Sequence, residues 1–64
     1  MLMTMYYVVT INGKIIAFQA DEVESDDERH SFMLDGELVG EFERKNIAGY
    51  FWEEVSEDEN EEDD

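Results

Sequence analysis

The side chains that could do chemistry are one histidine, three serines and many carboxylates, with no cysteine. A nucleophilic site needs a base beside a nucleophile and a third group that orients the base. Ser31 follows His30 directly, and neighbouring residues of a strand face opposite sides. Glu41 is expected opposite His30 as an exposed cross-strand pair. Because a shifted carboxylate pKa needs a cleft that so short a chain rarely encloses, we expect no enzyme and assign no catalytic residue.

An acidic segment at residues 21–28 offers oxygen ligands of the kind that Ca²⁺ prefers. It lacks the glycine at the sixth position of a calcium-binding loop, and no helices are expected beside it. We therefore expect weak counterion binding there, with no metal site and no cofactor. The acids concerned are Asp21, Glu22, Glu24, Asp26, Asp27 and Glu28.

Aromatic residues supply most of the expected core, with 12% of the chain being Phe, Trp or Tyr. Tyr50, Phe51 and Trp52 are consecutive, so a strand would place Tyr50 and Trp52 on one face and Phe51 on the other. An exposed Tyr–Trp pair among acids is typical of an interface, whereas a pair covered by the rest of a small barrel would be ordinary core.

Charge is distributed unevenly over the 64 residues, of which 19 are acidic and 4 basic, for a net charge of −15. Residues 53–64 hold nine acids and no base, which leaves residues 1–52 with ten acids and four bases, or −6. A like-charged block with one apolar residue, Val55, is expected to be disordered. We expect a folded domain at 1–55 and an acidic tail at 56–64. Such a surface disfavours nucleic acid and anionic membranes and favours basic proteins.

Two tight hairpins dominate the expected fold. Residues 5–11 and 14–20 are β-branched and aromatic and flank Asn12-Gly13, a strong signal for a type I′ turn. A two-residue turn pairs Ile11 with Lys14, Val9 with Ile16, and Tyr7 with Phe18.

The second expected hairpin joins residues 30–34 and 37–42 through Asp35-Gly36. Gly40 indicates a bulge or bend in its second strand. Its expected pairs are Leu34 with Glu37, Met33 with Leu38, and Phe32 with Val39.

Three shorter segments complete the expected chain. Residues 21–29 are a polar connection with Val23 at a strand edge, 44–46 form a single turn, and 47–52 form a last strand. No window of 11 or more residues has helical periodicity. We therefore predict an all-β domain of about five antiparallel strands, either a small half-open barrel or a curled meander.

Residues 40–47 carry a resemblance to SH3-type barrels, in which a strand runs through one helical turn into the last strand. The early aromatic ligand-binding motif of SH3 domains is absent, so the resemblance implies the fold alone. Two tight hairpins with an acidic tail also resemble small, uncharacterised phage and prophage proteins.

These features together predict a cytoplasmic, non-catalytic protein-interaction module, such as a phage accessory factor, that binds a basic partner. Two alternatives are a nucleic-acid mimic that inhibits a DNA- or RNA-binding protein, and an assembly protein that self-associates through its β edges. No direct binding to nucleic acid is expected, because the acidic chain repels phosphates. No membrane span is expected, because no apolar run is long enough to cross a bilayer, and the start of the chain does not resemble a signal peptide, because no basic residue precedes its apolar stretch. The expected partner-binding residues are Tyr50, Trp52, Asp26, Asp27, Glu28, Glu53 and Glu54.

Overall fold

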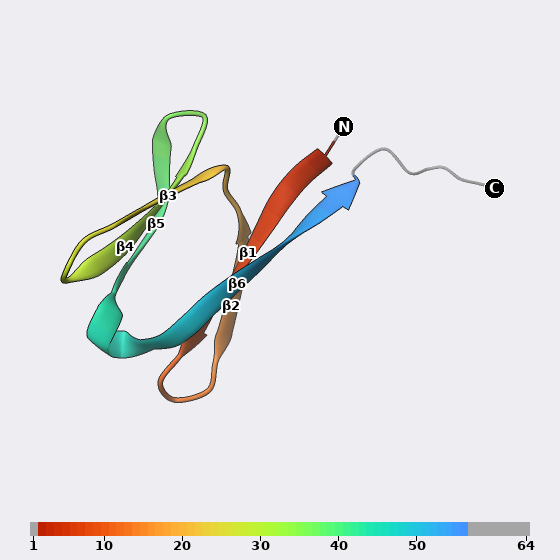
Figure 1. The fold of residues 1–64 in the computed structure, drawn as a ribbon. Helices are drawn as coiled ribbons and strands as arrows, with labels where there is room; N and C mark the ends of the chain where they lie inside the picture. The colour runs from red at the N-terminus through yellow and green to blue at the C-terminus, as the bar shows by residue number, and fades with distance from the viewer. Residues whose placement is uncertain (1, 57–64) are drawn as a thin grey trace.

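The computed structural model describes residues 2–56 as two three-stranded antiparallel sheets, in the orders β2-β1-β6 and β3-β4-β5 (Figure 1). The all-β prediction is confirmed, with six strands rather than about five, and the sheets do not close into a barrel. The acidic tail expected at 56–64 lies outside the described residues, apart from Ser56. The elements are β1 (Leu2–Thr10), β2 (Ile15–Gln19), β3 (Glu22–Ser25), β4 (Arg29–Leu34), β5 (Glu37–Glu43), the 3₁₀ turn η1 (Arg44–Asn46) and β6 (Ile47–Ser56).

The chain passes from one sheet to the other at Ala20 and Asp21. The Ala20 amide donates to the Thr4 carbonyl in β1 at 3.1 Å, whereas the next amide, of Asp21, donates to the Met33 carbonyl in β4 at 2.8 Å. Ala20 is 1% exposed, so the corner leaves room for little more than a methyl group. β2 and β3 therefore act as one bent strand that pairs first with β1 and then with β4.

The core is small and aromatic. Of the described residues, Val8, Ala20 and Phe32 are the only ones that are fully buried. Phe32 meets four other rings, all edge-on, at centroid distances of 5.0–5.9 Å. Aromatic pairs prefer this geometry, and it joins the two sheets at one point. The half-buried side chains around this centre are Tyr6, Phe18, Val23, Phe42, Ile47 and Tyr50.

The turn expected at Asn12-Gly13 is longer than predicted. The Thr10 amide donates to the Lys14 carbonyl at 2.8 Å, and the Gly13 amide donates to the Thr10 carbonyl at 3.0 Å, so three residues form the loop. The Thr10 hydroxyl bonds Asn12 Oδ1 at 2.8 Å and accepts from the Lys14 amide at 3.0 Å. Gly13 has a φ of 90°, as a three-residue hairpin loop requires at its left-handed position.

The longer loop shifts the register of the first hairpin by one residue. Ile11 lies in the loop and is 67% exposed, instead of pairing with Lys14. The expected pairs of Val9 with Ile16 and of Tyr7 with Phe18 are therefore wrong, because the one-residue slip places Ile16 and Phe18 on the face of Val8 and Tyr6 instead. The observed pairs are Tyr6 with Phe18, Tyr7 with Ala17, Val8 with Ile16, and Val9 with Ile15.

The second hairpin has the expected turn, with φ angles of 53° at Asp35 and 80° at Gly36. The pairs of Leu34 with Glu37 and of Met33 with Leu38 are confirmed. Phe32 pairs with Gly40 rather than Val39, because the ladder is irregular between Phe32 and Met33 and leaves Val39 unpaired. The bulge indicated by Gly40 is thus present, one residue before it.

Two strand boundaries differ from the expectation. β3 lies within the segment expected as a polar connection, where Val23 is its one residue packed against the core. β6 continues four residues beyond Trp52, because Glu53 to Ser56 pair with β1 back to Leu2. The single turn at 44–46 is confirmed as η1. No helix in residues 2–56 is long and apolar enough to cross a membrane.

Candidate interaction surface

An aromatic row lies on the face of β1 and β6 that turns toward the other sheet. Tyr6 and Trp52 are cross-strand partners with ring centroids 5.8 Å apart and planes tilted by 37°. Tyr50 lies two residues along β6 from Trp52, with centroids 6.3 Å apart, and 6.1 Å from Tyr6. We call these three rings the aromatic triad. Its members come from two adjacent strands, so the sheet itself fixes their spacing.

Exposure differs within the triad. Tyr50 and Tyr6 are half-buried because both rings pack edge-on against Phe32, at 5.4 and 5.2 Å. Trp52 lies at the outer end of the row and is 58% exposed. The sequence correctly placed Tyr50 and Trp52 on one face, and the structure adds that Tyr50 supports Trp52 from the core side.

The structure separates the five acids that were expected to bind the partner, two in β6 and three in the turn between β3 and β4. Glu54 is an exposed residue that pairs with Thr4, so it shares the face of Trp52. Glu53 lies on the opposite face and accepts a hydrogen bond from the Tyr7 hydroxyl. This bond, with burial and the negative charge of Glu53, raises the pKa of Tyr7. Of the two expected β6 acids, only Glu54 adjoins the triad.

The turn between β3 and β4 holds the other three expected acids. Asp26 Oδ1 accepts from the amides of Glu28 and Arg29 at 2.8 and 2.9 Å, and these bonds lower the pKa of Asp26. Arg44 donates through Nη1 to the Asp26 carbonyl at 2.8 Å and through its amide to the Glu28 carbonyl at 2.8 Å. The turn is therefore tied to η1.

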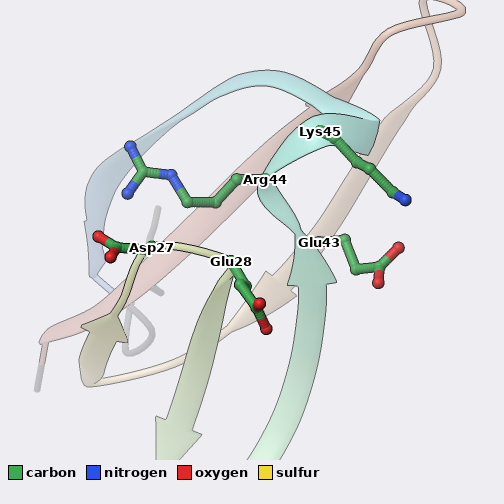
Figure 2. A pocket seen from close by; sticks show the side chains of 5 residues that line it. All are labelled: Asp27, Glu28, Glu43, Arg44 and Lys45. Carbon is green, nitrogen blue, oxygen red and sulfur yellow. The ribbon is translucent and has the colours of Figure 1, made fainter.

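A shallow hollow of about 300 Å³ lies between this turn and η1. Figure 2 shows the Arg44 side chain extending toward Asp27 at one side of the hollow, with Lys45 and Glu43 at the opposite side. Its lining is exposed and carries three acids and two bases, so the charges partly compensate one another. Asp27, Glu28, Glu43, Arg44 and Lys45 line it. In the described part of the chain, no three His, Cys, Asp or Glu side chains are grouped to hold a metal ion.

His30 has a partner that the sequence did not indicate. Its Nδ1 lies 2.6 Å from the hydroxyl of Ser25, the residue opposite in β3. Glu41 was expected opposite His30, but that position is occupied by Phe42, and Glu41 pairs with Ser31. Burial, and then the nearby Arg44, lower the pKa of His30 against the opposing effect of Asp26.

The imidazole of His30 also meets the Tyr50 ring edge-on at a centroid distance of 5.1 Å. Ser25, His30 and Tyr50 therefore connect the acidic turn with the aromatic triad. The Ser25–His30 contact follows from the pairing of β3 with β4. It was not predicted, because the sequence analysis did not recognise β3 as a strand.

The outer faces of the two sheets differ in character. The outer face of β3-β4-β5 carries four glutamates and Arg29, whose Nη1 lies 3.5 Å from Glu41. The outer face of β2-β1-β6 carries one acid, Glu53, among apolar side chains. On this apolar outer face, Ile15 is 61% and Phe51 52% exposed, and Phe51 stacks on Tyr7 at 5.0 Å.

Comparison of the chain with protein-family models, curated proteins and solved structures finds no match.

Proposed function

We propose that this protein is a non-catalytic interaction module, acting in the cytoplasm, that binds a basic protein through the aromatic triad and the acids around it. The observation that carries the proposal is Trp52, which is 58% exposed while resting on two half-buried tyrosines. Tryptophan and tyrosine are enriched among the residues that dominate binding energy at interfaces, and a ring already held in place loses little conformational freedom on binding.

The charge of the chain supports a basic partner. A net charge of −15 on 64 residues attracts positive surfaces over a Debye length and repels negative ones. Such long-range attraction accelerates encounter, whereas buried aromatic contacts slow dissociation. We accordingly expect the association rate to fall with salt and the dissociation rate to depend on Trp52.

The experiment is capture of partners from the native host's lysate at low and high salt, with the full chain and with a chain that ends at Ser56. A basic protein that both chains retain at high salt supports binding through the folded surface. A partner that only the full chain captures, and that salt releases, would instead assign binding to residues 57–64 and support the alternative of a nucleic-acid mimic or an acidic docking tail.

Self-association is a second candidate, and the apolar outer face favours it. β2 is an edge strand without a charged residue. Ile15 in β2, and Phe51 in β6 at the other edge of the sheet, each expose more than half of their surface on the apolar outer face. Charges on edge strands usually prevent pairing with another chain, so an uncharged edge next to an apolar face is suited to assembly.

A further inference from the structure

We propose that Trp52, supported by Tyr6 and Tyr50, binds a cationic side chain of the partner, foremost an arginine guanidinium, through a cation–π contact. This inference rests on the proposed function and assigns the chemical group that the aromatic triad recognises.

The geometry of the triad suits a planar cation. The Trp52 ring is tilted by 37° to Tyr6 and by 35° to Tyr50, and both tyrosines lie on the side that faces Phe32. These contacts hold the indole from one side and leave 58% of the residue exposed to a ligand. Tryptophan is the best of the aromatic side chains for cations, and guanidinium stacks flat on its face.

The charges around the triad also select a cation. β1 and β6 contain no Lys or Arg, so neither strand supplies a cation of its own. Glu54 shares the face of Trp52. Asp21 is close enough to Tyr6 to contribute, after burial and Tyr50, to the raised pKa of its hydroxyl. Carboxylates near the triad would lower the free energy of a bound cation and raise that of an anion.

An apolar ligand, such as a leucine or proline side chain, is the main competitor for an exposed indole. It would gain from burial of the ring but nothing from Glu54 or Asp21. A cation and a neutral isostere of the same shape therefore distinguish the two types of ligand.

The test uses the full chain and two peptides, tetra-arginine and tetra-citrulline, since citrulline keeps the planar shape and apolar stem of arginine without its charge. Trp52 is the only tryptophan, so intrinsic fluorescence reports on the proposed site directly. Both titrations are made at the same ionic strength. We expect tetra-arginine to change the emission saturably and tetra-citrulline to leave it unchanged. Equal responses to the two peptides would overturn the cation–π assignment.

Calorimetry with tetra-arginine and matched variants locates the site. We expect Trp52→Leu to weaken binding by about 3- to 30-fold and Trp52→Phe to weaken it less. Phe51→Leu is the control, because Phe51 is similarly exposed but lies on the opposite face of β6.

The outcomes separate this inference from the proposed function. Unchanged affinity in Trp52→Leu, with binding lost at high salt, would overturn the cation–π site while leaving an acidic surface that binds basic partners. No binding of tetra-arginine at low salt would contradict both. Circular dichroism of each variant checks that the fold is intact.

Discussion

Phe51 and Trp52 are neighbours in β6, and each exposes more than half of its surface on opposite faces of the same sheet. Trp52 belongs to the aromatic triad beside Glu54, whereas Phe51 stacks on Tyr7 within the apolar outer face. One strand thus presents two different aromatic surfaces. Because their side chains do not share a face, single substitutions can test the two surfaces separately.

Self-association should depend on Phe51 and not on Trp52. We expect the isolated chain to associate weakly at high protein concentration, and more strongly as salt rises, because salt screens the repulsion between acidic copies. Phe51→Glu should abolish the association by adding a second acid near Glu53, and Trp52→Leu should leave it intact. Sedimentation velocity measures both. A chain that stays monomeric at all salt concentrations would eliminate this second candidate.

Among the side chains of the core, Phe32 should contribute most to the free energy of unfolding. It is fully buried and meets four rings, so Phe32→Ala should lower the free energy of unfolding by about 3–5 kcal/mol. For a chain of this length such a loss is close to the whole stability, so Phe32→Leu serves as a milder second variant. Urea denaturation measures the loss, with Phe51→Ala as the exposed control. Equal effects of Phe32→Leu and Phe51→Ala would show that the core is elsewhere.

Gly36 and Gly49 provide a matched pair of backbone substitutions. Gly36 has a φ of 80°, and Gly49 has no positive φ; a Cβ at either position meets no atom within 4 Å. We expect Gly36→Ala to cost about 1–2 kcal/mol because alanine is strained in the left-handed region. Gly49→Ala should be neutral or slightly stabilising. Thermal unfolding measures both, and an equal loss in the two variants would contradict the type I′ turn.

His30 should make stability depend on pH. Its pKa is lowered in the folded state, so the unfolded chain takes up a proton first as the pH falls. The contribution of the neutral imidazole is therefore complete above the unfolded pKa of about 6.5, and is lost as the pH falls from there to the folded value. The test compares the unfolding free energies of the wild type and His30→Asn at pH 7, 6 and 5, since the carboxylates titrate in both. As the pH falls, the unfolding free energy of the wild type should decrease relative to that of His30→Asn. A difference between the two that stays constant from pH 7 to pH 5 would refute a role of His30 in the pH dependence.

The sequence predicted those parts of the fold that local chemistry determines. Asp35-Gly36 adopted its type I′ turn, and the strands beside it paired as expected up to the bulge. At Asn12-Gly13 the same reasoning failed, because Thr10 bonds both Asn12 and the Lys14 amide and closes a three-residue loop. Such a side-chain bond is not evident from the dipeptide that signals the turn.

Tertiary contacts determined what the sequence missed. β3 has one core residue, Val23, among acids, and it becomes a strand because β4 lies beside it. That pairing brings Ser25 to His30, a contact that could not be predicted from a segment expected to be a polar connection. Two members of the aromatic triad could be predicted, because side chains alternate along a strand and this places Tyr50 and Trp52 on one face. The third, Tyr6, could be added only from the register of β1 against β6.

The measurement that tests the central claim most directly is capture of partners from the native host's lysate with three full-length chains: wild type, Trp52→Leu and Phe51→Leu. The account predicts that the wild type and Phe51→Leu retain the same basic protein through a high-salt wash, and that Trp52→Leu loses it. Retention of that protein by all three chains, or capture of no basic protein by any of them, would contradict the claim that the face of Trp52 is the binding surface.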